Sequence, residues 1–245
     1  MQDQGAEFRP YARKGIITDK IACCQDTYYR VYLFPVKPTL LAIIGKPLAG
    51  KDTQADLLVA AHPEAVKIST GHIMRAVREE GETHRFWPLI GPYIPMMEQG
   101  LKLPDEPTIA MLSEVIREQF SEGKQLLVIA GSPRGLDQLD GFEKIAQETG
   151  ANLVLVHMDA TDEETYKRSA SRNEGRVDDT PEVHAVRLKE YEDFVGPMAD
   201  KLARENRLIW VNGMQPVEGV FRQMEQQLRQ HTLDPEITLP AMARR

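Results

Sequence analysis

One stretch decides how this chain folds: Leu40-Leu-Ala-Ile-Ile-Gly-Lys-Pro-Leu-Ala-Gly-Lys-Asp-Thr-Gln54. Its first five residues are apolar and predict a buried strand that ends at Gly45. From Lys51 onward, apolar residues recur at the spacing of a helix buried on one face. The frame Gly45-x4-Gly50-Lys51, between a strand and a helix, is that of a phosphate-binding loop. Backbone N–H groups and the helix N-terminus converge on anionic oxygens in such a loop, and Lys51 adds a mobile positive charge.

Strands and helices alternate along the chain on both sides of this loop. Four more buried strands are predicted at residues 65–69, 125–130, 153–158 and 208–211. Helices are predicted at residues 109–120, 136–149, 163–171, 181–193, 198–206 and 217–230, and a helix capped by Ser69 or Thr70 carries Arg75. We therefore predict an α/β fold of the P-loop type, a doubly wound parallel five-stranded sheet with helices on both faces. Residues 81–107 carry five prolines and predict a small inserted subdomain.

Length, charge and cysteine content exclude several classes of function. The 245 residues suffice for one large domain, and the net charge of −7 disfavours a nucleic-acid-binding surface. No apolar run approaches the ~20 residues of a membrane span, and the N-terminus lacks a signal-peptide core, so we expect a cytoplasmic protein. The two cysteines, Cys23 and Cys24, are adjacent and supply neither a disulfide framework nor a four-ligand zinc site.

The two ends of the chain are interpreted separately from a core at residues 38–231. Residues 1–37 form an N-terminal extension of unknown role, in which residues 27–34 alternate well enough to predict an ordered strand. An added edge strand, an interface arm and a partly disordered extension remain alternatives for this segment. The cysteine pair as a redox or metal-responsive element is a further alternative. The C-terminal tail, residues 232–245, is expected to be peripheral.

Seven cations lie just after the predicted strands or in the loop that bounds the site: Lys51, Arg75, Arg134, Arg168, Arg172, Arg176 and Arg187. So many cations at one rim of an acidic chain predict an anionic ligand, and two nucleotides would bring enough phosphates. Guanidinium groups suit this role because their planar fork binds phosphate oxygens in pairs. Arg168 and Arg172 share one helix face at i,i+4.

Taken in order along most of the chain, these motifs resemble the adenylate kinases, within the nucleoside monophosphate kinases. The resemblance rests on residues 45–54 as the phosphate loop, 69–75, 100–106, Gly131-Ser-Pro-Arg134 followed by Gln138, and the arginines from 168 to 187. It implies a monophosphate-binding insertion at about residues 69–107. It also implies a short lid at about residues 172–180, with no room for a four-ligand metal knuckle.

The resemblance also implies a role for each matching residue. ATP would contact Gly45, Leu48, Ala49, Gly50, Lys51, Asp52, Thr53, Arg168, Arg172 and Gly213. AMP would contact Thr70, Arg75, Leu101, Leu103, Gly131, Arg134, Gln138, Arg176 and Arg187, with Gln138 reading the adenine. The catalytic set would be Lys51, Arg134, Arg172, Arg176 and Arg187. No direct protein ligand to metal is implied, because Mg²⁺ would be held by nucleotide phosphates and water, with Asp52, Asp178 and Asp179 bordering its water shell.

Four residues depart from the family pattern near the phosphates. Leu48 stands at a family glycine, where its side chain crowds the loop or changes its backbone. Asp52 replaces the glycine after the lysine, and a carboxylate beside a triphosphate is repelled unless it points away or reaches the metal shell. Ala130 replaces an aspartate that organises the metal's water shell, and Ser132 replaces a phenylalanine. Asp52 supplying the acidic function lost at Ala130 is one hypothesis, and drift in a weakened enzyme is the other.

We therefore expect a phosphotransferase that uses ATP and a nucleoside monophosphate, with AMP favoured, in the Mg²⁺-dependent reaction ATP + AMP ⇌ 2 ADP. The alternatives are a UMP/CMP-type kinase and a nucleotide-binding pseudokinase whose N-terminal arm binds a partner. Neither nucleic acid nor membrane is expected as a partner. We expect a monomer unless the N-terminal arm mediates association.

Overall fold

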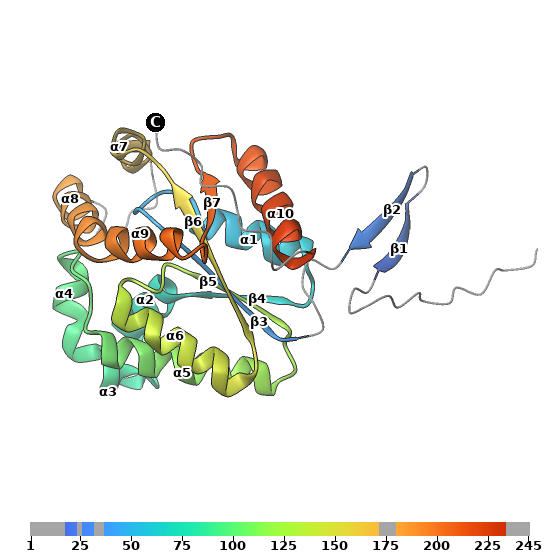
Figure 1. Ribbon diagram of the computed structural model, residues 1–245. Helices are drawn as coiled ribbons and strands as arrows, with labels where there is room; N and C mark the ends of the chain where they lie inside the picture. Colours follow the sequence, from blue (N-terminus) through green and yellow to red (C-terminus); the bar gives the residue numbers. More distant parts are fainter. Residues whose placement is uncertain (1–17, 24–25, 32–36, 172–179, 234–245) are drawn as a thin grey trace, which may run out of the picture.

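A parallel five-stranded sheet forms the centre of the molecule. The computed structural model describes residues 18–23, 26–31, 37–171 and 180–233 (Figure 1). The strands are β3 (Thr39–Gly45), β4 (Ala65–Ser69), β5 (Leu126–Ala130), β6 (Asn152–Asp159) and β7 (Ile209–Asn212). They lie in the order β4-β5-β3-β6-β7, and every neighbouring pair is parallel. The predicted fold class is confirmed, with the strand of the phosphate loop in the middle of the sheet.

Helices cover both faces of this sheet (Figure 1). The α-helices are α1 (Lys51–Ala61), α2 (Thr70–Glu80), α3 (Trp87–Ile90), α4 (Ile94–Glu98), α5 (Asp105–Ser121), α6 (Leu136–Thr149), α7 (Asp162–Ser171), α8 (Pro181–Glu190), α9 (Gly196–Arg204) and α10 (Val217–Leu233). Short 3₁₀ turns η1 (Gly81–Thr83) and η2 (Gly91–Tyr93) flank α3, and a π-helical turn η3 (Tyr191–Val195) joins α8 to α9.

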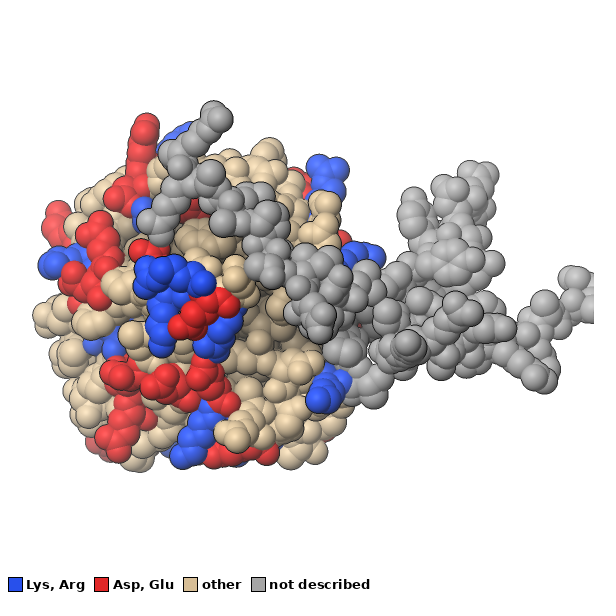
Figure 2. Space-filling model, in the orientation of Figure 1, with Lys and Arg blue, Asp and Glu red and all other residues tan. Residues whose placement is uncertain are grey.

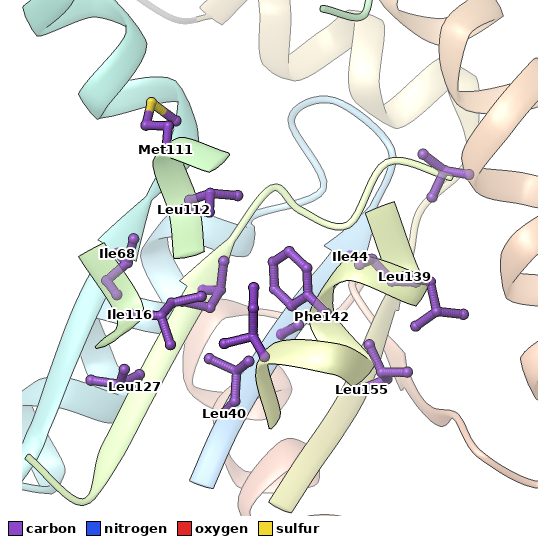
Figure 3. Close-up of a cluster of buried hydrophobic side chains, with 14 of the residues drawn as sticks. Leu40, Ile44, Ile68, Met111, Leu112, Ile116, Leu127, Leu139, Phe142 and Leu155 are labelled. Carbon is purple, nitrogen blue, oxygen red and sulfur yellow. The ribbon is translucent and has the colours of Figure 1, made fainter. Parts of the chain in front are cut away.

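Strand β3 is buried on both faces because its side chains alternate between two hydrophobic clusters. Leu40 and Ile44 pack with α5, α6 and α9 on one face, as Figure 3 shows for α5 and α6. Leu41 and Ile43 pack with α1 and α10 on the other face. Phe142 of α6 is fully buried over β3, which stabilises the layer by about 2–3 kcal/mol. This double burial holds the C-terminal end of β3, and hence the loop after it, in one place.

The segment from β4 to α5 follows the sequence prediction closely. Ser69 caps α2 by accepting the His72 N–H at 3.4 Å, which starts the helix as the residue pattern indicates. Prolines at the first turns of α3 and α4 keep these helices short, so residues 81–104 form a compact insertion rather than another core helix.

The helical stretch that begins at Pro181 differs from the prediction. A helix over residues 181–193, a break, and a second helix from 198 were expected. Instead α8 runs through the π turn η3 directly into α9, with Pro197 in the first turn of α9. Proline is tolerated there because the first N–H groups of a helix need no partner within it. The continuous helical backbone therefore fixes the side chains of α8 relative to those of α9.

The N-terminal extension contains a strand, as predicted, but the strand does not join the central sheet. Strand β2 (Asp26–Val31) pairs antiparallel with β1 (Thr18–Cys23) in a two-stranded sheet of its own (Figure 1). This excludes the alternative of an added edge strand. Residues 32–34 of the predicted strand, Cys24, and the tail beyond Leu233 lie outside the described residues.

Acidic and basic side chains are interspersed on the face shown in Figure 2. Within the described part of the chain, every helix is too short or too polar to cross a bilayer.

Candidate active site

The loop between β3 and α1 has a backbone geometry that suits anion binding. Gly45 has φ 139°, and a Cβ there would lie 2.4 Å from the Met158 carbonyl oxygen of β6, so only glycine fits. Gly50, with φ 96°, turns the chain into α1. Leu48 adopts φ 59°, so the loop keeps a left-handed residue despite the side chain. Successive N–H groups in such a backbone point inward and attract anions.

Lys51 reaches back across this loop. Its ammonium group donates to the Gly45 carbonyl at 2.9 Å and to the Lys46 carbonyl at 2.5 Å. Burial, and then the positive charge of Arg134, lower the pKa of Lys51 from 10.5 to about 7, while Asp52 opposes this shift. The ammonium group is therefore held in a place where an anion would stabilise its charge.

A cavity opens on the β4–β5 side of the loop and gathers four of the predicted cations, Lys51, Arg75, Arg134 and Arg187, from four separate elements. Predicted contacts Gly45, Leu48, Leu101, Leu103 and Gly131 line the same cavity. Its apolar wall comes from Met74, Met97, Leu101, Leu103 and Val195. A flat apolar wall beside clustered cations suits a ligand with a base at one end and phosphate at the other. We call this space the acceptor-side cavity.

Arg134 is fixed near the end of the loop between β5 and α6. Its Nε donates to the Gly131 carbonyl at 2.9 Å, and its backbone N–H donates to Gln138 Oε1 at 2.8 Å. Burial, and then the charge of Arg187, lower the pKa of Arg134 from its usual value. The guanidinium is thus aimed into the cavity beside a like charge, a pairing that an anionic ligand relieves.

Two predicted AMP contacts lie behind the cavity wall. Gln138 is only 1% exposed, and its side chain holds the Arg134 N–H. Thr70 is equally buried, and its hydroxyl donates to Ser132 Oγ at 3.0 Å. Neither residue lines the cavity as the other predicted contacts do. In this structure both residues support the wall from within the protein.

A second cavity, which we call the donor-side cavity, opens on the outer side of the loop. Predicted ATP contacts line it: Leu48, Ala49, Gly50, Lys51, Asp52, Thr53, Arg168 and Gly213. Arg168 of α7 donates to the Leu48 carbonyl at 3.2 Å and to the Gly213 carbonyl at 2.8 Å, and its Nε pairs with Glu164 at 2.9 Å. The two cavities share Leu48, Lys51 and Asp52, so ligands in both would meet at Lys51.

Comparison with known proteins agrees with this geometry. The sequence model of one family, described as adenylate kinase, matches residues 43–206. Adenylate kinase of Salinispora tropica is 32% identical over 74% of this chain and 93% of its own length. UMP-CMP kinase 3 of Arabidopsis thaliana is 30% identical over 77% and 88%, and uridylate kinase of Schizosaccharomyces pombe is 32% identical over 74% and 93%.

The chain belongs to the adenylate kinase family. It is therefore a phosphotransferase of the nucleoside monophosphate kinase class. The predicted roles that fall on Arg172, Arg176, Asp178 and Asp179 lie outside the described residues of this kinase.

The departure at Asp52 has a structural answer in this kinase. Asp52 Oδ1 lies 3.1 Å from Lys67 Nζ of β4, and Lys67 also contacts Asp56 at 2.9 Å. Burial raises the pKa of Asp52. The charge of Lys67 and hydrogen bonds from Lys67 and Ser69 lower this pKa by more, so it lies below its ordinary value. The carboxylate is thus ionised and held by a lysine rather than left alone beside the phosphates. Nothing in the residue pattern of β4 singled out Lys67.

The described part of the kinase has no group of three His, Cys, Asp or Glu side chains able to hold a metal ion. Ala130, which stands in place of the family's aspartate, lines the acceptor-side cavity. The carboxylate of Asp52 contacts Lys67.

Two residues that the sequence analysis missed also line the acceptor-side cavity, Glu190 and Tyr191. Glu190 Oε2 accepts the Lys102 N–H at 2.8 Å, and Tyr191 forms a 2.7 Å hydrogen bond with His157. Both follow Arg187 by one helical turn or less, so the helical spacing from Arg187 was the signal that could have found them.

Proposed function

We propose that this kinase transfers the γ-phosphoryl group of Mg²⁺-bound ATP reversibly to AMP, giving two molecules of ADP. The observation that carries the proposal is the meeting of two cavities at one lysine. Lys51 borders both, while Arg75, Arg134 and Arg187 line the acceptor-side cavity alone. Phosphoryl transfer asks little covalent chemistry of a protein and depends on alignment and on neutralising the charge of the moving group.

Each group has a defined task in this proposal. Lys51 holds the β- and γ-phosphates of the donor, and its ammonium charge is stabilised as negative charge gathers there. Arg134 and Arg75 hold the phosphate of the acceptor, whose oxygen attacks the γ-phosphorus. Arg187 acts on the transferring group together with Arg172 and Arg176. When bound with ATP, Mg²⁺ neutralises charge on the phosphates, and Asp178 and Asp179 border its water shell.

AMP is the acceptor that the sequence resemblance favours, through Gln138. The apolar wall of Met74, Met97, Leu101 and Leu103 suits a purine base. A second acceptor class also has support, because Gln138 is buried and its oxygen is engaged by Arg134. Because this oxygen is engaged, Gln138 has only its amide N–H groups left for contacting a base. The competing acceptor is therefore a pyrimidine nucleotide such as UMP or CMP.

A coupled assay of ADP formation from ATP with AMP, GMP, CMP or UMP, with and without Mg²⁺, tests the proposal. Mg²⁺-dependent turnover that is fastest with AMP is the expected result. Preference for UMP or CMP would overturn the acceptor assignment and keep the reaction class. ATP binding without turnover of any acceptor would overturn the catalytic proposal and favour a nucleotide-binding role with a partner for the N-terminal extension.

A further inference from the structure

The helical segment from Arg187 to Val195 forms one wall of the acceptor-side cavity. Arg187 and Glu190 lie in the last turn of α8, and Tyr191 opens the π turn η3. All three line the cavity. A π turn inside a helix costs hydrogen-bond regularity and occurs frequently at functional sites, where it re-aims side chains. The position of this segment therefore decides where Arg187 stands.

The same segment holds the loop before α5, which also lines the cavity. Glu190 accepts the Lys102 N–H at 2.8 Å. Two residues earlier in the same loop, a Cβ on Gly100 would lie 2.9 Å from the Val183 carbonyl oxygen and 3.2 Å from Arg187 Cγ. Gly100, with φ 82°, thus lets the loop lie directly on α8. Any shift of α8 would move this loop with it.

A buried histidine anchors the segment to the sheet. His157 of β6 is 1% exposed and pairs in register with Ile44, the residue before the phosphate loop begins. Its Nε2 lies 2.7 Å from Tyr191 Oη, and its ring packs against Trp210 of β7, with the ring centroids 4.2 Å apart and the planes tilted by 54°. Nδ1 has no hydrogen-bond partner among the described residues, so the bond to Tyr191 is the polar contact of this ring that the structure contains.

The chemistry of the pair favours a fixed, neutral arrangement. Burial, and then the charges of Lys51 and Lys46, lower the pKa of His157 to about 3, so the ring stays neutral. A proton on Nε2 that is donated to Tyr191 leaves only a lone pair unpaired at Nδ1, which costs less than an unpaired buried N–H. An apolar residue would fill this place in the core without that cost. The polar contact therefore calls for a purpose beyond packing.

We propose that His157 is a positioning residue that, by binding Tyr191, anchors the Arg187–Tyr191 segment to the sheet and thereby sets the acceptor loop relative to the phosphate loop. The chain of contacts runs from His157 through Tyr191 and Glu190 to the Lys102 backbone. The proposal rests on the proposed function in one respect, that the acceptor-side cavity binds the nucleoside monophosphate. The donor-side cavity is lined by none of these residues, so the effect is specific to the acceptor.

Three variants test the anchor: Tyr191→Phe removes the hydroxyl, His157→Met keeps an apolar side chain of similar length, and His157→Gln keeps a donor near the place of Nε2. We expect Tyr191→Phe and His157→Met to raise the acceptor KM and lower kcat, each roughly tenfold, since small misplacements of reacting groups are costly. The ATP KM stays within about twofold, and His157→Gln recovers most of the loss. The double variant His157→Met/Tyr191→Phe is no worse than either single variant, because both break one contact.

Tyr166→Phe is the control, since Tyr166 is a tyrosine of α7 that lines neither cavity, and it should leave both KM values unchanged. Equal rises in the two KM values, losses that follow the drop in Tm, or additive effects in the double variant would overturn the proposal.

Calorimetric titration with AMP and with ATP separates this proposal from the proposed function. A parent protein that binds AMP without phosphorylating it would reject the function and still test the anchor, through the AMP Kd of each variant. Loss of AMP affinity in Tyr191→Phe with unchanged ATP affinity supports the anchor. Unchanged affinity for both nucleotides in every variant would overturn it.

Discussion

The two cavities that meet at Lys51 are built in different ways. On the donor side, Arg168 donates to the carbonyls of Leu48 and Gly213 and pairs with Glu164. Its hydrogen-bonding groups are therefore already engaged within the protein. On the acceptor side, Lys51 and Arg134 face each other and Arg187, and burial with these like charges lowers the pKa of both Lys51 and Arg134.

The difference separates a cation whose described contacts support the loop from cations that also repel one another. The hydrogen bonds that the charged Arg168 donates stabilise the loop whether or not a ligand is bound. The acceptor-side cations carry a repulsion that bound phosphates would relieve, so part of the binding energy is stored as destabilisation of the empty protein. Variants on the two sides should therefore behave oppositely in stability and activity.

Lys51→Met should give the largest effect. We expect phosphoryl transfer to fall about 10²–10³-fold, or about 3–4 kcal/mol, because a preorganised charge at the transferring group is lost. The empty protein should be no less stable than the parent at pH 6, where the buried ammonium is charged and costly. Steady-state kinetics and thermal unfolding measure the two. Lys189→Met is the control, because Lys189 is 72% exposed and pairs with Asp193. Near-normal turnover in Lys51→Met would reject its assigned role.

Arg168→Met should show the reverse pattern. Loss of its two hydrogen bonds to the loop carbonyls should lower the free energy of unfolding of the empty protein by about 2 kcal/mol. The ATP KM should rise, since the loop loses its support, while the AMP KM changes little. Chemical denaturation and kinetics check this. A variant as stable as the parent would remove the distinction between the two sides.

The low pKa of Lys51 predicts that ATP binding takes up a proton. Between about pH 7 and its ordinary value of 10.5, Lys51 is mostly neutral in the empty protein, and bound phosphates favour the ammonium form. The bound state thus holds more protons, so ATP affinity falls as pH rises above 7, by at most about tenfold per unit. Without ligand, the unfolded chain binds more protons than the folded protein in this pH window. The free energy of unfolding therefore rises with pH there.

Calorimetry at pH 8 in buffers of different ionisation enthalpy measures the uptake, expected at up to about one proton per ATP. Lys51→Arg should bind without uptake, since guanidinium is charged throughout. The same uptake in both proteins would assign the proton to another group.

The Asp52–Lys67 pair predicts the smallest effect, on the shared wall. Lys67→Met should weaken ATP binding about fivefold, or about 1 kcal/mol, because Asp52 is left unpaired near the phosphates, a modest figure since Asp52 is 63% exposed. Asp52→Asn in that background should restore the affinity. A fall of the Mg²⁺-dependent kcat in Asp52→Asn, with unchanged ATP Kd, would instead support Asp52 in the metal's water shell.

Much of the fold followed from local patterns. The strand 40–44 and the helix from Lys51 were predictable because burial on two faces and on one face leave distinct periodicities. The π turn at Tyr191 was not, because a single helical pattern over 181–193 is equally compatible with a break and with continuation. The pairing of β2 with β1 rather than with the central sheet was also invisible, because strand residues alone do not name a partner.

The candidate site shows the same division. Lys51, Arg75, Arg134 and Arg187 were named from their motifs, and the structure brings them into one cavity. Lys67 and His157 carry no motif, because their importance comes from Asp52 and Tyr191, which are distant in sequence. Gln138 was named as a base reader, but its burial against the Arg134 backbone depends on how the loop before α6 closes.

By itself the sequence determined the parallel sheet, the phosphate loop, the family and the residue types at the rim, since each depends on spacings within a few turns of chain. Only the tertiary structure decided which hydrogen bonds the cations make, that Asp52 is paired with Lys67, and that His157 contacts Tyr191. These contacts join residues far apart along the chain, and their energies depend on burial and orientation that no local pattern records.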